Sequence, residues 1–280
     1  MRALTSIVKR HPMISFFVLS YVLTWLGWTM PERLYTGTIG SGLLALPFML
    51  MVPGPLIASI VVTVIMDGWP GVKALLRKFT IWRVDWQWYL IAIGLGPLVG
   101  LTATYMNVAL GAPNPTTLLV AAIPSTLLLF ATRLVNPMDG PMQEELGWRG
   151  YALPWFQERY QPLVANLILG VIVAGWHLPW VWQGQLPLFA LLGTVAYAIV
   201  AAWIVNNTKG SVLLALITHA ADGLIRAGFT GADLTRFYIF YVAAWWVVVG
   251  VILLVYGPSL TGKRAEAARH TPVKQAAAVK

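Results

Sequence analysis

Two adjacent carboxylates stand in an otherwise apolar stretch of this sequence. The segment MQEELGWRGYALPWF at 142–156 carries Glu144, Glu145 and Arg149 among tryptophans and leucines. Residues four apart share a helix face, so Glu145 and Arg149 can pair. Glu144 lies about 100° further round the helix, too far to share that arginine comfortably. A charge inside an apolar helix costs about 2.5–3.5 kcal/mol on insertion scales, so a charge that lacks a structural partner is a candidate for function. Glu144 is that candidate.

Two histidines occupy apolar stretches further along the chain. His177 lies in GVIVAGWHLPW, and His219 lies with Asp222 in LLALITHAADG. A turn near Tyr160 between antiparallel helices would bring Glu144 level with His177, and His219 can face the same interior from a later helix. The glutamate could act as a general base while the histidines stabilise an oxyanion. Alternatively, the three side chains could ligate Zn²⁺. Both routes attack an amide or another acyl group.

Each of these residues also has a purely structural interpretation. A lone histidine in a helix more often packs in a core than catalyses a reaction, and Asp222 can pair with Arg226 four residues later. Recurrence of Glu, His and His on separate helices favours chemistry, but a proton-coupled transporter uses the same residue types. The residues alone therefore leave a hydrolase and a transporter open. A transporter would show inverted repeats with paired broken spans, whereas the polar residues here cluster in one half.

The elements that must position these side chains are apolar helices. The chain has 280 residues, 58% hydrophobic and 10% charged, with a mean hydropathy of +0.72. A helix needs roughly 20 apolar residues to cross about 30 Å of hydrocarbon. Eight blocks approach that length: 13–30, 39–66, 86–110, 111–132, 160–181, 186–205, 211–227 and 237–257. The predicted fold is therefore an all-α, polytopic membrane helix bundle of about eight transmembrane helices.

Three segments of the sequence predict departures from regular spanning helices: two predict irregular backbone, and the third predicts a connection between spans. Pro53, Gly54 and Pro55 interrupt the block 39–66, which predicts a kink or a split there. The stretch NPMDGP at 136–141 predicts irregular chain before a helix over 141–153 that is too short to span. The basic amphipathic stretch 67–85 predicts a cytoplasmic connection at the membrane surface.

Basic residues predict the orientation of the bundle. If eight spans alternate from an amino terminus inside, Arg33, Arg226 and Arg236 are the outside members of nineteen Lys and Arg residues. Positive charge marks cytoplasmic loops, so both termini are predicted to be cytoplasmic and the net charge of +9 does not predict a nucleic-acid partner. Residues 1–257 are predicted to form a single transmembrane helical domain. Residues 258–280 are predicted to form a polar, basic, disordered cytoplasmic tail.

The three polar groups, in this order, resemble the motifs of the CPBP intramembrane proteases, the family of CAAX prenyl endoproteases and bacteriocin-processing enzymes, also called Abi. EELGWRG at 144–150 is similar to the EExxxR motif. GWHLP at 175–179 is similar to the second motif, and NNTKGSVLLALITHAADG at 206–223 to the third. Any one motif alone is weak, but three in order over about 140–225 are specific.

The resemblance implies an eight-helix intramembrane endopeptidase. Its water-activating glutamate maps onto Glu144, its supporting pair onto Glu145 and Arg149, and its motif histidines onto His177 and His219. Members have been described both as metalloproteases and as metal-independent glutamate proteases, so no cofactor is firmly predicted. Zn²⁺ on Glu144, His177 and His219 stays open. The lack of a carboxylate near His177 in sequence slightly favours the metal-free form.

One departure from the family pattern concerns the third motif. The family usually has Asn four residues after the histidine, where a carboxamide can stabilise an oxyanion, and Gly223 stands here. Asp222, one place earlier, could orient His219 or pair with Arg226. A catalytically impaired membrane scaffold is therefore an alternative to an active protease.

The resemblance also implies partners and a location. The substrate would be a membrane-associated peptide, either a CAAX-like prenylated protein or a leader peptide, and the other partner would be membrane lipid. The expected location is a bacterial-type inner (plasma) membrane, crossed several times. The absence of cysteine excludes disulfides, thiolate metal ligands and a cysteine nucleophile.

Overall fold

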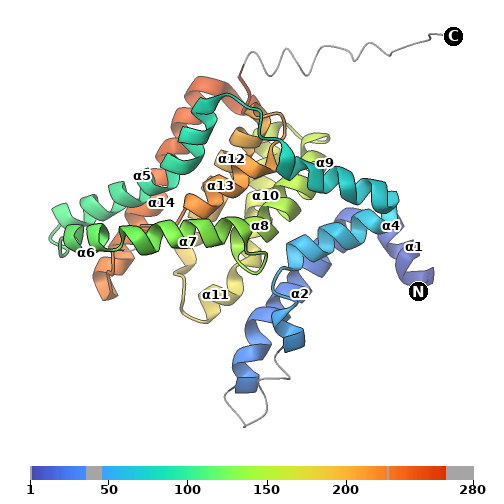
Figure 1. Cartoon of the computed structure of the whole chain (residues 1–280), viewed down its shortest axis with the longest axis horizontal. Coiled ribbons are helices and arrows are strands. Elements are labelled where there is room, and N and C mark those ends of the chain that lie inside the picture. Colours follow the sequence, from blue (N-terminus) through green and yellow to red (C-terminus); the bar gives the residue numbers. More distant parts are fainter. Residues whose placement is uncertain (1, 36–45, 226, 263–280) are drawn as a thin grey trace.

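The computed structural model describes residues 2–35, 46–225 and 227–262, and this part of the chain is helical without any strand (Figure 1). The α-helices, numbered as in Figure 1, are α1 (Arg2–Arg10), α2 (Pro12–Tyr35), α4 (Gly54–Arg77), α5 (Trp86–Ala109), α6 (Thr116–Ala121), α7 (Ile123–Val135), α8 (Gly140–Glu145), α9 (Leu153–Gln157), α10 (Pro162–Trp176), α11 (Leu178–Trp182), α12 (Leu191–Asn207), α13 (Val212–Ala221) and α14 (Gly231–Tyr256). A π-helical turn, Leu146–Ala152, joins α8 to α9, and short 3-10 turns lie at Lys78–Thr80, Leu188–Ala190 and Gly257–Ser259. Most of the predicted tail, 263–280, lies outside the described residues.

Five helical stretches are long and apolar enough to cross a membrane: Pro12–Met30, Gly54–Thr80, Trp86–Ala109, Leu188–Asn207 and Gly231–Ser259. Two further apolar helices, α10 and α13, are shorter. The protein is thus an all-α, multi-pass membrane protein, as the sequence predicts. The number of eight spans and the cytoplasmic position of both termini stay predictions.

The block 111–132 does not form one span. It contains α6 and the first part of α7, separated at Ala122. Pro124 lies in the first turn of α7, where a proline lacking N–H is tolerated but would break the interior of a longer helix. The prediction of a continuous helix over this block is therefore wrong.

The proline-rich break at Pro53–Pro55 splits its block in two. α4 begins at Gly54, and a Cβ on Gly54 would lie 2.6 Å from the carbonyl oxygen of Ser20 on α2. This glycine therefore lets α4 approach α2 closely. α4 kinks at Gly68, whose φ is +66°, and helical turns continue through Thr80. Much of the stretch predicted as a connection over 67–85 is thus helical.

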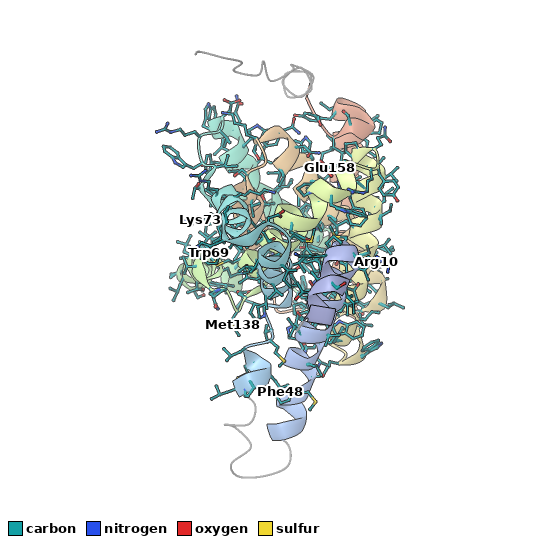
Figure 2. The ribbon with its side chains drawn as sticks, turned by 90° about the vertical axis from the view of Figure 1, so that its right-hand side faces the viewer. Arg10, Phe48, Trp69, Lys73, Met138 and Glu158 are labelled. Carbon is teal, nitrogen blue, oxygen red and sulfur yellow. The ribbon has the colours of Figure 1, made fainter. Side chains whose placement is uncertain are left out.

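α12 is the central helix of the bundle. The apolar stretch that contains it is 72% buried inside the protein, against 17–33% for the other four spans. It packs against α10, α13 and α14, and α5 packs against α13 and α14. By contrast, the far end of α2 and the segment around Phe48 project away from the bundle (Figures 1 and 2). α10 and α13, which lead into or carry the two motif histidines, thus pack directly against the most buried of the five spans.

Candidate active site

Glu144 and Glu145 end the short helix α8. The Oδ1 atom of Asp139 caps this helix by accepting a hydrogen bond of 2.7 Å from the N–H of Gly140. The stretch 136–141, predicted to be irregular, thus leads into a regularly capped helix that begins at Gly140. A π-helical turn follows directly after Glu145. Such turns are frequent at functional sites because they re-aim side chains along a helix.

Glu145 has two partners. Its Oε2 atom lies 3.3 Å from Nε of Arg149, which confirms the pair predicted from their spacing. Its Oε1 atom lies 2.8 Å from Nδ1 of His219 on α13. Because a carboxylate only accepts, Nδ1 carries the hydrogen and Nε2 of His219 faces away from Glu145. All of Glu145 is buried, so these contacts fix the imidazole in one orientation.

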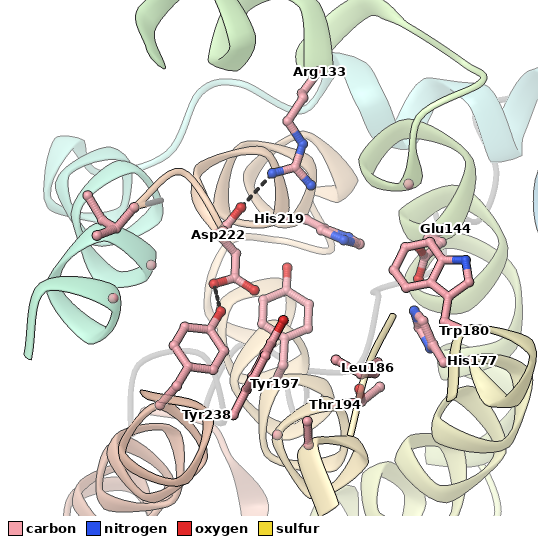
Figure 3. Close-up of a pocket in the computed structure, with 18 of the residues that line it drawn as sticks. Arg133, Glu144, His177, Trp180, Leu186, Thr194, Tyr197, His219, Asp222 and Tyr238 are labelled. Atoms are coloured by element: carbon pink, nitrogen blue, oxygen red, sulfur yellow. Dashed lines mark hydrogen bonds between the residues drawn. The ribbon is translucent and has the colours of Figure 1, made fainter. Parts of the chain in front are cut away.

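Glu144 has no such partner. Its carboxylate forms no hydrogen bond or ion pair with any residue in the described ranges, although Glu144 is only 4% exposed. It lines a cavity of about 700 Å³ that His177 and His219 also line (Figure 3). It interacts electrostatically with both histidines. The division between a paired and an unpaired glutamate therefore follows the one that the sequence predicts.

His177 caps the carboxyl end of α10. Its Nδ1 atom lies 2.9 Å from the carbonyl oxygen of Val173. A carbonyl oxygen only accepts, so Nδ1 is the protonated nitrogen, and Nε2 has no hydrogen-bond partner among the described residues. The ring packs edge-on against Trp176 and Trp180, with centroids 4.8 and 5.4 Å away. The turn between Gln157 and Pro162 brings His177 and Glu144 to the same cavity, as predicted from a turn near Tyr160.

Asp222 does not hold His219. Its carboxylate accepts a hydrogen bond from the hydroxyl of Tyr241 on α14, and Nδ1 of His219 is already engaged by Glu145. The expectation that Asp222 orients His219 is therefore corrected: Glu145 does so. Asp222 lines the cavity with the other predicted residues. The alternative pair with Arg226 involves a residue outside the described ranges.

Arg133 on α7 is a site residue that the sequence analysis missed. Its Nη1 atom donates to the backbone carbonyls of Ala220 (3.2 Å) and Asp222, as Figure 3 shows for Asp222. Its Nε atom lies 3.6 Å from Asp139. A Cβ on Gly223, where the family usually has Asn, would lie 3.9 Å from this Nη1. Position 223, where the family's carboxamide would stand, thus borders the guanidinium of Arg133. In the sequence, the one sign of this residue was a charge next to an apolar block.

A zinc site would need ligand atoms from Glu144, His177 and His219. The Nδ1 atoms of both histidines are engaged, which would leave their Nε2 atoms as ligands. Within the described ranges, however, no group of three or more His, Cys, Asp or Glu side chains is close enough to hold a metal ion. In this arrangement Glu144, His177 and His219 do not fit a three-ligand zinc site.

The chain is similar to known proteins. Residues 122–225 match the family described as Type II CAAX prenyl endopeptidase Rce1-like. A curated relative, CAAX prenyl protease 2 of Methanococcus maripaludis, is 31% identical over 91 residues. That alignment covers 27% of this chain and 32% of the relative, so the chain matches about a third of the relative's length. Residues 122–225 contain all three motifs, so this part of the chain is similar to the Type II CAAX prenyl endopeptidases where the motif residues lie.

Proposed function

We propose that this protein is an intramembrane endopeptidase that hydrolyses a peptide bond in a membrane-associated substrate, with Glu144 activating the attacking water. The observation that carries the proposal is the buried carboxylate of Glu144, which has no hydrogen-bond or ion-pair partner in the described part of the chain and lies in the cavity that two histidines line. The matched family of CAAX prenyl endopeptidases and the relative named CAAX prenyl protease 2 support this reaction class.

In the first step, Glu144 takes a proton from water while the water oxygen attacks the carbonyl carbon of the substrate. A C–O bond forms, and the electron pair of the carbonyl double bond moves to the oxygen. In the second step, that pair re-forms the carbonyl bond, and the C–N bond breaks. The carboxylic acid of Glu144 then gives its proton to the leaving amine.

The two histidines stabilise the oxyanion in this proposal. Glu145 accepts the Nδ1 hydrogen of His219 and favours the imidazolium, whose Nε2–H can donate to the developing charge. His177, with Nδ1 on Val173, presents Nε2 to the same cavity and can donate when it is doubly protonated. Arg149 balances the charge of Glu145 inside the protein. These steps use protein side chains alone.

A prenylated CAAX-like peptide is the proposed substrate class, with a leader peptide as the other member of the same class of membrane-bound peptides. The cavity is lined by aromatic side chains from several helices, including Trp28, Trp180, Phe229, Phe237 and Tyr238. Such a surface favours an apolar chain, while a few polar groups fix its orientation. We propose that the protein works in a bacterial-type inner membrane in contact with lipid.

Cleavage of a farnesylated peptide by purified protein tests this function. Wild type should release the carboxyl-terminal fragment, and Glu144→Gln should release about 10²–10⁴-fold less, since removing a general base typically costs that much. A parallel reaction with chelator tests whether a metal takes part. A Glu144→Gln variant that cleaves like wild type would refute the role of Glu144. A wild type inert towards prenylated and leader peptides would favour the scaffold alternative.

A further inference from the structure

Gln143, the residue before Glu144 on α8, carries a buried carboxamide. Gln143 is 1% exposed, and neither polar atom of its side chain forms a hydrogen bond with a residue in the described ranges. An amide that leaves water without gaining a partner costs free energy, so buried amides in native folds are almost always bonded. The carboxamide of Gln143 therefore calls for a role outside the packing of the protein interior.

Gln143 lines the same cavity as Glu144 and the two histidines, which Figure 3 labels. Its Oε1 atom is enclosed by protein, whereas its Nε2 atom is not among the enclosed, unbonded polar atoms of the described residues. The NH₂ end is therefore the part of the side chain that the cavity reaches. Tyr197 and Trp245 also line the cavity, but the hydroxyl of the first and the indole N–H of the second are enclosed. Gln143 thus offers N–H donors to the cavity from the position beside the unpaired glutamate.

Such a donor meets a need that the two histidines meet only when charged. Both His177 and His219 carry their hydrogen on Nδ1, and that hydrogen is already donated to a protein oxygen. Either ring therefore has an N–H for the cavity only as an imidazolium, which is protonated on both nitrogens. A carboxamide carries its hydrogens at every pH. Donors that are already in place when the charge develops stabilise an oxyanion most effectively, because nothing has to reorganise.

We propose that Gln143 is a catalytic residue, whose Nε2–H donates a hydrogen bond to the oxyanion of the substrate. The inference rests on the proposed hydrolysis and adds a neutral donor to it. When the electron pair of the carbonyl bond moves to the oxygen, Gln143 stabilises that oxygen, while Glu144 receives the proton of the water. Gln143 itself transfers no proton, so the balance of the step is unchanged. A carboxamide from α8 would then serve a chain that has Gly223 in place of the third-motif Asn.

Gln157 on α9 provides a matched control. Its Nε2 atom is also buried without a hydrogen-bond partner among the described residues, but Gln157 is not one of the residues that line the cavity. Methionine is close to glutamine in length and lacks the carboxamide, so the same substitution can be made at both positions. Because neither carboxamide has a full set of partners in the protein, Gln143→Met and Gln157→Met should both melt near or above the wild-type temperature.

The experiment compares these two variants in the full chain, with the farnesylated peptide as substrate. Gln143→Met should lower kcat by about 10²–10³-fold, as loss of one oxyanion donor typically does, and KM should stay near the wild-type value. Gln157→Met should keep kcat within about threefold of wild type. A Gln143→Met variant that turns over like Gln157→Met would overturn the inference. So would a lowered melting temperature with unchanged turnover per folded molecule, because the carboxamide would then be structural.

A second measurement separates binding of the oxyanion from binding of the substrate. A phosphinate analogue of the farnesylated peptide carries a charged oxygen where the oxyanion develops. Gln143→Met should weaken binding of this analogue by about the factor lost in kcat/KM, and should leave binding of a non-cleavable farnesylated peptide unchanged. Equal weakening of both ligands would contradict the inference. An inert wild type, or an active Glu144→Gln variant, would instead sink the proposed function, which separates the two failures.

Discussion

The two adjacent glutamates of α8 lie in opposite surroundings. Glu145 is fully buried, and it forms an ion pair with Arg149 through Oε2 and accepts a hydrogen bond from His219 through Oε1. Glu144, one residue earlier, has no partner within the described ranges and borders the cavity. Under the proposed function, the difference teaches that structural support and chemistry are divided between two neighbours in the sequence. A carboxylate held by two partners can orient other groups, whereas one without such partners is free to exchange a proton.

His219 connects the two surroundings. Its Nδ1 atom contacts the paired glutamate, and its ring lines the same cavity as the other glutamate. In the proposed mechanism, the paired glutamate acts on the reaction through the imidazole. Variants on each side of His219 should separate stability from turnover.

Arg149→Ala should cause the largest loss of stability. It leaves the buried charge of Glu145 without its arginine, and breaking a buried pair in this way costs about 3–5 kcal/mol. Thermal unfolding in detergent measures the effect. The control is Arg159→Ala, since Arg159 pairs with Glu158 at the surface and exposed pairs contribute about 0–1 kcal/mol. Equal melting temperatures for the two variants would show that the buried pair is not a structural support.

His219→Ala should act mainly on turnover. Loss of an oxyanion donor typically lowers kcat by about 10²–10³-fold, and KM should change little. Steady-state cleavage of the farnesylated peptide provides both constants. His11→Ala is the matched control, because His11 is exposed near the amino terminus and far from the cavity in sequence. A kcat for His219→Ala close to that of the control would remove His219 from the chemistry.

Asp222→Ala and Tyr241→Phe should have similar, intermediate effects on stability. Each removes the same hydrogen bond to a carboxylate, worth about 1.5–3 kcal/mol. The double variant should be no less stable than the single variants, since one interaction is lost in all three. Turnover per folded molecule should stay unchanged, because Glu145 orients His219. A fall in turnover confined to Asp222→Ala would restore a direct catalytic role for this carboxylate.

Gly223→Asn should have the smallest effect. The φ of Gly223 is +70°, a region that Asn tolerates better than most residues, whereas another side chain costs roughly 1–2 kcal/mol there. Gly223→Val is therefore the destabilised control. Cleavage by Gly223→Asn should remain within about threefold of wild type, since Arg133 already borders this place. A large gain in kcat would mean that the family's carboxamide is a missing catalytic donor.

The sequence predicts the contacts that local geometry controls. Glu145 and Arg149 are four residues apart, and helix periodicity alone places them together. The cavity shared by Glu144 and His177 follows from two helices joined by a short turn. Hydrophobic length identifies the long spans, such as α5 and α12. In each case the deciding information lies within a few helical turns.

Contacts set by packing between helices could not be predicted. The bond between Glu145 and His219 joins residues 74 apart, and its existence depends on how α13 lies against α8. The Tyr241 contact of Asp222 likewise depends on the position of α14. A single proline, Pro124, was enough to divide an apolar block that composition treats as one span. Spacing along the helix predicted Asp222 as the partner of His219, whereas helix packing makes Glu145 its partner.

The most direct test of the division of labour compares Glu144→Gln with Glu145→Gln in one experiment. Melting temperature and turnover per folded molecule are measured for both, with the farnesylated peptide as substrate. Glu144→Gln should melt near wild type and lose turnover by about 10²–10⁴-fold. Glu145→Gln should melt far lower, because it leaves Arg149 buried without its carboxylate. Equal melting temperatures, or a Glu144→Gln variant that turns over at the wild-type rate, would contradict the account.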